Sequence, residues 1–343
     1  MPISQVHHKF RQQSVWFLLL ISLFCTGIEL SARTYRFGMI PWIAYSPLHV
    51  AEVKGFWKNL GINVEVVPYY TNPELYNAIA SGQVDISMDM IGSMVGMHQS
   101  GVPVKILGES DWSHGGDKII IKQNLDSARL KAKPIGVYLN KPSVTFFLQK
   151  FLNDNKVKIS EVKVIELTMQ ELADRFIDET LSVILNCDPD ALRAERKGEG
   201  RLAATSADYS GCIPEGFVAR SDILEKIPAD DQVKIFRGWV KAVKWIHNPS
   251  NWDEYRSILN TVTFKNDGPF TDNDLREMLR SVRIHPYSTQ FRRNSNPEGL
   301  KKYLQDLHDF LAENKQLVHD YQVTEILHNE NLLEALKIES DRE

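Results

Sequence analysis

The stretch Phe37-Gly-Met-Ile-Pro-Trp-Ile-Ala-Tyr-Ser-Pro-Leu48 predicts a buried strand that turns through an aromatic loop into a helix. Its first residues form a short apolar run that ends at a proline, as in a parallel strand covered on both faces. Ser46 and Pro47 suit the cap and the first turn of a helix. Trp42 and Tyr45 then lie at the carboxyl end of a strand, where open α/β sheets bind ligands. The alternative is that both rings only cover the end of the sheet.

Residues 1–32 are predicted to be a signal peptide that is cleaved on export. A positively charged start precedes an apolar core from Val15 to Cys25, and a small residue at position 32 suits cleavage. The apolar run is shorter than the roughly 20 residues of a membrane-spanning helix, which argues against a membrane anchor. The bulky Phe24 disfavours the further alternative, a lipid on the cysteine that follows it. The mature chain is expected to begin near Arg33.

The composition gives no reason to expect a nucleic-acid or membrane partner. The 343-residue chain has a formal net charge of −4, and loss of Lys9, Arg11 and Glu29 with the signal peptide takes away one net positive charge and leaves −5. A mildly acidic protein without a basic stripe has no electrostatic attraction to nucleic acid or anionic lipid. Cys187 and Cys212 remain after cleavage, in a compartment where disulfides persist. Whether they pair stays open.

Strand-like and helix-like segments alternate from residue 35 to residue 107, which favours βαβ units and a parallel sheet. The segment from Gly108 to Asp117 has two adjacent glycines and no apolar period, so we expect a loop that crosses into a second lobe. The pattern restarts at residue 118. After Phe217 the remainder is expected to be helical, without strands of its own, and to wrap the first lobe. The expected division is 33–117 for the first part of lobe 1, 118–212 for lobe 2, and 213–343 for the return to lobe 1.

Four segments in order along the chain resemble a known family: Trp42-Ile-Ala-Tyr-Ser-Pro-Leu48, Ala51-Glu-Val-Lys-Gly-Phe-Trp57, Gly82-Gln-Val-Asp85 and Gly101-Val-Pro-Val-Lys-Ile106. They look like the periplasmic solute-binding proteins of nitrate, sulfonate, taurine and thiamine-precursor ABC transporters. The resemblance implies an α/β, two-lobed type II periplasmic binding protein fold with a hinge. Each lobe would be a mainly parallel sheet flanked by helices, with a helical C-terminal region and the solute held between the lobes.

The resemblance also places site residues on two jaws. Trp42, Tyr45, Asn72 and the helix start that contains Ser93 would form one jaw. The loop that contains Ser143 and the strand end at Asp188 would form the other, and Asp117 lies where the chain crosses between lobes. The cysteine-rich motif of the pyrimidine-synthesising relatives does not occur in this sequence, which argues against the enzymatic branch.

The charges expected around the cleft favour a particular kind of solute. Helix N-termini at Ser46, Ser93 and Ser143 would favour an anionic group. Three carboxylates are expected to face the same cleft, namely Asp89, Asp117 and Asp188, and only Lys141 stands opposite as a fixed positive charge. Buried carboxylates need a cationic or hydrogen-bonding partner, so an amine-bearing, zwitterionic or N-heterocyclic solute is favoured over nitrate or sulfate. A solute of the sulfonate or thiamine-pyrimidine class is the alternative. The alternative is that these aspartates are turn or capping groups.

No enzymatic signature occurs in the sequence. It contains no G-x-S-x-G elbow, Walker loop or H-E-x-x-H motif, and its histidines are scattered without metal-ligand spacing, so we expect no catalytic residue, metal or cofactor. The expected function is the periplasmic solute-binding component of an ABC importer, whose partner is a membrane permease. Closure would occur through Glu109 to Asp117 and Thr205 to Pro214. The alternatives are a subunit that reports ligand occupancy to a membrane signalling protein, or a pyrimidine-synthase-like enzyme.

Overall fold

The computed structural model describes residues 33–125, 127–267 and 269–340. The predicted signal peptide, residues 1–32, lies outside the described residues. The chain from Thr34 onward belongs to one compact unit. Within the described part of the chain, no helix has the length and apolar character that crossing a membrane requires.

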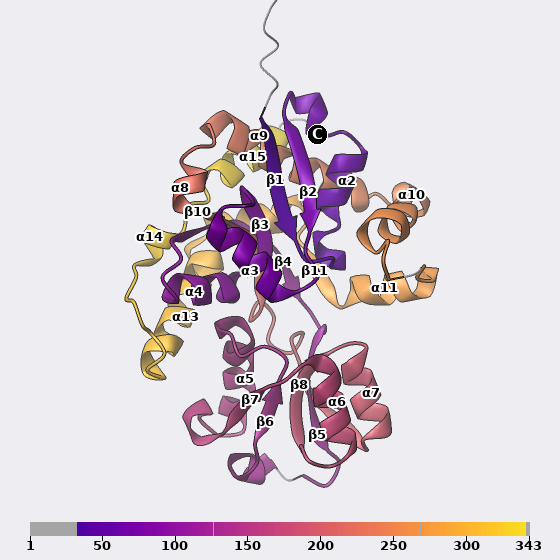
Figure 1. The fold of residues 1–343 in the computed structure, drawn as a ribbon, viewed down its shortest axis with the longest axis vertical. Coiled ribbons are helices and arrows are strands. Elements are labelled where there is room, and N and C mark those ends of the chain that lie inside the picture. The colour runs from indigo at the N-terminus through magenta and orange to yellow at the C-terminus, as the bar shows by residue number, and fades with distance from the viewer. Residues whose placement is uncertain (1–32, 126, 268, 341–343) are drawn as a thin grey trace, which may run out of the picture. The chain divides into compact units, whose positions relative to one another are not determined.

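The first sheet has six strands in the spatial order β11-β4-β10-β3-β1-β2 (Figure 1). Its strands are β1 (Thr34–Met39), β2 (Asn63–Pro68), β3 (Ile86–Met90), β4 (Val104–Ser113), β10 (Pro214–Arg220) and β11 (Val282–Ile284). The strand β1 is parallel to both its neighbours, β2 and β3. In contrast, β10 is antiparallel to β3 and β4, and β11 is antiparallel to β4.

The second sheet has five strands in the order β7-β6-β8-β5-β9. They are β5 (Asp117–Lys122), β6 (Ile135–Val137), β7 (Val164–Glu166), β8 (Val183–Cys187) and β9 (Gly200–Thr205). The strand β6 is parallel to β7 and β8, whereas β5 is antiparallel to β8 and β9. The expected α/β architecture with two sheets is confirmed. The expectation of mainly parallel sheets was wrong, because β10 and β11 in the first sheet and β5 in the second are antiparallel to their neighbours, so both sheets are mixed.

Helices cover both sheets. Those that belong to the first and last parts of the chain are η1 (Ile43–Tyr45), α2 (Pro47–Val53), η2 (Lys58–Leu60), α3 (Asn72–Ser81), α4 (Ile91–Gln99), α8 (Ser221–Leu224), α9 (Ala229–Ile246), η5 (Pro249–Asn251), α10 (Trp252–Ile258), η6 (Leu259–Thr263), α11 (Asp272–Arg280), α12 (Tyr287–Ser295), η7 (Pro297–Lys301), α13 (Lys302–Glu313), α14 (Val323–Ile326) and α15 (Glu330–Ser340). Those between β5 and β9 are η3 (Ser127–Ala132), α5 (Pro142–Asp154), η4 (Ile159–Glu161), α6 (Met169–Ile177) and α7 (Asp190–Lys197).

Three apolar cores hold these layers together. One packs α2, α9 and α15 against the first sheet, and another packs α6 and α7 against the second. The third joins residues of α4, α5 and α13 with strands of both sheets. In it, Phe146 of α5 makes edge contacts with the rings of Tyr303 and Phe310 on α13, at centroid distances of 5.8 and 5.4 Å. The C-terminal region therefore packs against α5 as well as against the first sheet.

Two segments differ from the sequence-based expectation. The strand β4 continues to Ser113, so most of the segment expected to be a loop is paired strand. Its pairing with β10 shifts register near Gly108, whose φ of 137° suits glycine, and this irregularity hides the strand in the sequence. The C-terminal region also contributes β11 to the sheet edge, contrary to expectation; a three-residue strand gives too short a pattern to recognise.

The chain passes between the sheets twice, and the two passages are joined by hydrogen bonds. The first lies between β4 and β5, and the second between β9 and β10. Ser206 Oγ accepts from the Gly115 backbone N–H at 2.8 Å and hydrogen-bonds to Ser113 Oγ at 2.9 Å. The Ser206 N–H donates to the Asp117 carbonyl at 2.9 Å. Lobe boundaries at 117/118 and 212/213 stay a prediction.

Candidate solute-binding site

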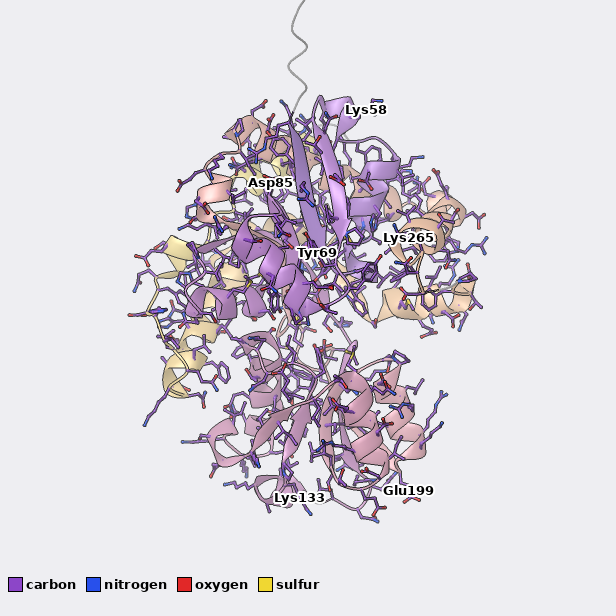
Figure 2. The ribbon with its side chains drawn as sticks, viewed as in Figure 1. Lys58, Tyr69, Asp85, Lys133, Glu199 and Lys265 are labelled. Atoms are coloured by element: carbon purple, nitrogen blue, oxygen red, sulfur yellow. The ribbon has the colours of Figure 1, made fainter. Side chains whose placement is uncertain are left out.

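The aromatic turn after β1 is packed against its neighbours. Tyr45 is buried, and the Ser46 hydroxyl donates to the Ile43 carbonyl at 2.6 Å and hydrogen-bonds to the Tyr255 hydroxyl at the same distance. The side chain of Ser46 therefore does not cap α2, which corrects that expectation. The backbone N–H of Tyr69, labelled in Figure 2, donates to the Met39 carbonyl at 2.8 Å and ties the end of β2 to the start of this turn.

Trp42 lies next to the first passage between the sheets. A Cβ added at Gly116 would lie 3.8 Å from the Trp42 ring, so the indole approaches the segment that leads into β5. The indole Nε1 is buried and has no hydrogen-bond acceptor. Such a donor is rare in a folded protein, and leaving it unpaired costs about 1–3 kcal/mol.

The starts of α4 and α5 are in direct contact. Ser93 Oγ and Ser143 Oγ hydrogen-bond to each other at 2.8 Å, and both side chains are buried. A Cβ added at Gly92 would lie only 2.6 Å from the Ser143 backbone nitrogen. The structure thus brings together two of the predicted site residues from opposite jaws, and the contact requires glycine at position 92.

Three buried carboxyl groups near Tyr45 lie on neighbouring strands of the first sheet. Asp111 of β4 stands directly opposite Glu215 of β10, and Asp89 of β3 stands opposite Gly216. The exposed fractions are 0% for Asp111 and 4% for both Asp89 and Glu215. Tyr45 lies within electrostatic range of all three and hydrogen-bonds to Glu215.

Burial dominates the electrostatics of this group, which we call the buried acid cluster (Asp89, Asp111 and Glu215). Burial raises the pKa of Asp89 to about 7, partly offset by its hydrogen bond from the Met90 N–H. Burial also raises the pKa of Asp111 and of Glu215, and the negative charge of Asp111 raises the pKa of Glu215 further. Each member has one buried oxygen without a donor: Asp89 Oδ2, Asp111 Oδ1 and Glu215 Oε2. Such atoms are suited to a donor supplied by a ligand.

The other predicted site residues lie at different levels of burial. Asp117 is buried and accepts from the hydroxyls of Ser113 and Tyr138, both at 2.6 Å; burial nevertheless raises its pKa. Asn72 is half-buried at the first position of α3. The side chain of Asp188 is 45% exposed and forms an ion pair with Lys118. Asn72 and Asp188 therefore lie outside the buried acid cluster.

Comparison with known proteins identifies the family. Residues 30–260 match the model of the NMT1-like family, which is more than half of the chain. The chain belongs to the NMT1-like family. This NMT1-like protein is 26% identical over 257 residues to YtlA of Bacillus subtilis (strain 168), which is named as a binding protein by provisional assignment. The match covers 72% of this chain and 74% of YtlA.

Other proteins of known structure share the fold of this NMT1-like protein. The periplasmic aliphatic sulphonate binding protein SsuA from Escherichia coli aligns with a TM-score of 0.67 and 16% identity, covering 86% of this chain and 92% of SsuA. The periplasmic nitrate-binding protein NrtA from Synechocystis PCC 6803 aligns with a TM-score of 0.65 and 15% identity, covering 90% of this chain and 89% of NrtA. These names are of binding proteins, in agreement with the expected non-enzymatic role, and the resemblance seen in the sequence is confirmed.

A second buried charge centre anchors β4 to the C-terminal region of the NMT1-like chain. Glu109 Oε1 accepts from Trp112 Nε1 at 2.7 Å and from Arg293 Nε at 2.8 Å, and it lies 2.8 Å from His285 Nε2. Arg293 Nη2 donates to Oε2 at 2.9 Å. Burial alone would raise the pKa of Glu109, but the bonds from His285 and Arg293 hold it below its usual value.

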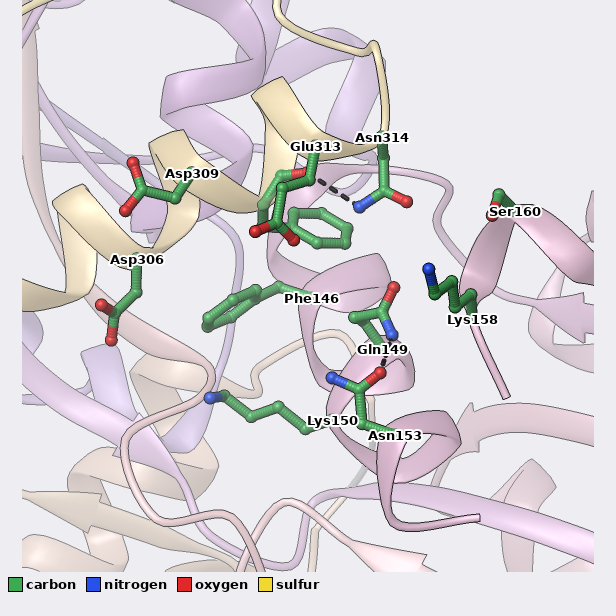
Figure 3. Close-up of a pocket in the computed structure, with 11 residues that line it drawn as sticks. Phe146, Gln149, Lys150, Asn153, Lys158, Ser160, Asp306, Asp309, Glu313 and Asn314 are labelled. Atoms are coloured by element: carbon green, nitrogen blue, oxygen red, sulfur yellow. Dashed lines mark hydrogen bonds between the residues drawn. The ribbon is translucent and has the colours of Figure 1, made fainter. Parts of the chain in front are cut away.

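A groove of about 660 Å³ lies between α5 and α13, away from the predicted site (Figure 3). Lys150 and Lys158 come from the α5 side, and acidic residues come from α13. None of the predicted site residues lines it. Its lining is mainly polar and charged, unlike the convergent aromatic and buried polar groups around Tyr45.

Within the described residues, no group of three His, Cys, Asp or Glu side chains is arranged to hold a metal ion. Cys187 and Cys212 are both free thiols. Sequence reasoning missed Asp111, Glu215 and Tyr138 as site residues. No signal in the sequence marked Asp111, because the segment from Glu109 to Ser113 contains only one apolar residue, Trp112, and shows no alternation of apolar and polar residues.

Proposed function

We propose that this protein is the periplasmic solute-binding component of an ABC importer, which captures a small organic solute between two lobes and delivers it to a membrane permease. Membership of the NMT1-like family and the fold shared with sulfonate- and nitrate-binding proteins support this function. A periplasmic location would follow from cleavage of the predicted signal peptide. The lobes would be residues 33–117 with 213–343, and residues 118–212.

The solute is proposed to be amine-bearing, zwitterionic or N-heterocyclic. The observation that carries this choice is the buried acid cluster, whose members have no ion-pair partner among the described residues. Trp42 and Tyr45 would offer ring faces to a cation or a flat heterocycle. Ser93 and Ser143, at the contact of α4 and α5, would close over the solute, with Asp117 at the passage between the lobes. Asn72 and Asp188 would lie at the rim.

A thermal-shift screen of the mature protein tests this proposal. The panel consists of amino acids, polyamines, pyrimidines, sulfonates and nitrate, because a ligand that binds only the folded state raises the unfolding temperature. We expect an amine or N-heterocycle to raise it. Stabilisation by nitrate or a simple sulfonate alone would reject the proposed solute class.

A second measurement separates uptake from signalling. Uptake of the stabilising solute should fall in cells that lack the gene for this protein, and it should return with the wild-type gene. Normal uptake combined with a lost transcriptional response to the solute would instead favour the sensory role.

A further inference from the structure

We infer that Asp111 and Glu215 share one proton in the ligand-free protein, and that a primary ammonium group of the solute takes the place of this proton. The inference rests on the proposed function and deepens it in two respects. It names the residues that select the solute, and it identifies a proton exchange that accompanies binding.

The geometry of the pair requires a positive partner. Asp111 and Glu215 face each other across neighbouring antiparallel strands and lie within hydrogen-bonding reach of each other. Two ionised carboxylates cannot hydrogen-bond, because both only accept. Like charges placed directly opposite on a sheet repel, and the repulsion is strongest where water is excluded. One proton between the two groups removes the repulsion and satisfies both oxygens that lack a donor.

The surroundings of the pair do not offer another cation. The titratable groups that interact with it are Glu109 on β4, Asp117 on β5, Tyr45 on η1 and Tyr138 after β6. The nearby cationic side chain, Arg293, is bound to Glu109 by two hydrogen bonds, and His285 lies against the same carboxylate. Within the described residues, no Lys or Arg forms an ion pair with Asp111 or Glu215.

The free acceptors of the pair suit an ammonium group. Asp111 and Glu215 each have one buried oxygen without a donor. A primary ammonium has three N–H donors and one positive charge, so it can donate to both carboxylates. When it enters, the carboxyl O–H bond breaks, the proton leaves to solvent, and the freed carboxylate accepts an N–H. One positive charge replaces another, so the net charge of the site is unchanged.

Access to the pair requires movement, because both carboxyl groups are buried in this arrangement. The solute would enter when the start of α5 moves away from the start of α4. The exchange is selective because an anionic solute would add a negative charge to the cluster and could not replace the proton.

Infrared spectroscopy at neutral pH tests the shared proton without any ligand. We expect wild-type protein to show an absorption of protonated carboxyl groups that is reduced in the double variant Asp111→Asn and Glu215→Gln, whose amides keep the shape of the protonated acids. Asp253→Asn is the matched control, because its side chain is 89% exposed. Equal absorption in the wild type and the double variant would overturn the inference.

The same wild-type sample tests the exchange, so the inference does not depend on folding of the double variant. We expect ethylammonium chloride to reduce the protonated-carboxyl absorption and to raise the unfolding temperature, and sodium ethanesulfonate to do neither. Retention of the absorption with every amine would overturn the exchange. If an anionic solute stabilises the protein while the absorption persists, solute binding stands and the exchange is refuted. If amines reduce the absorption but uptake does not depend on the protein, the exchange stands and the importer role is refuted.

Discussion

Replacement of Gly92 by alanine should weaken solute binding while leaving the protein folded. The added Cβ would lie 2.6 Å from the Ser143 backbone nitrogen and 2.7 Å from its Cα. Both atoms belong to the main chain, so no side-chain rotation relieves the clash, and the starts of α4 and α5 must separate. The hydrogen bond between Ser93 and Ser143 would then be lost or lengthened.

The magnitude follows from the cost of overpacking, which is about 1–3 kcal/mol for an added carbon in a tight contact. Because about 1.4 kcal/mol corresponds to a factor of ten in affinity, the solute should bind about 5- to 150-fold more weakly. Alanine is a better helix former than glycine, and the proposed lobes can move apart. The ligand-free Gly92→Ala protein should therefore unfold at a temperature close to that of the wild type.

Isothermal titration with the first stabilising solute from the screen measures the effect. Gly96→Ala is a graded control on the same helix, since its added Cβ would lie 3.1 Å from Pro142 Cδ, a milder clash. We expect a smaller loss of affinity for this variant. Wild-type affinity in Gly92→Ala would refute closure through the contact of α4 with α5.

Three further predictions concern stability and binding. Glu109→Gln should lower the free energy of unfolding by about 3–5 kcal/mol in urea titrations, because it leaves the guanidinium of Arg293 without its charge partner. A loss below about 1 kcal/mol would show that the ion pair is dispensable. Burial raises the pKa of Asp89 to about 7. The contribution of this group to the free energy of unfolding is therefore complete below its unfolded pKa of about 4 and is lost as the pH rises to about 7. Asp89→Asn should flatten this decline, and a pH profile of stability equal to that of the wild type would contradict the prediction. Trp42→Ala should abolish the thermal stabilisation by the solute, whereas Asp188→Ala should reduce it only partly, and the reverse order would place the solute at the rim.

The sequence alone allowed the local features of the fold to be predicted. Apolar runs identified β1 to β3, and the resemblance placed Ser93 and Ser143 on facing jaws, where the structure brings them into contact. The buried acid cluster was predicted only in part. Asp89 was singled out, but Asp111 and Glu215 were not, because acidic residues in a segment with glycines look like a solvated loop.

The partners of such residues are set by tertiary contacts over long sequence separations. Glu109 is neutralised by Arg293, 184 positions later, and no periodicity in the sequence connects the two. The ion pair of Asp188 with Lys118 was missed for the same reason, since the pairing of β5 with β8 brings the two together. Local patterns predict elements, whereas buried charge pairs depend on which strands become neighbours.

A crystal structure of the protein with the first amine or N-heterocycle that stabilises it tests the central claim most directly. The solute should lie beside the rings of Trp42 and Tyr45, with a nitrogen within hydrogen-bonding distance of Asp111 or Glu215. A solute bound in the groove between α5 and α13, with the buried acid cluster unchanged, would contradict this assignment.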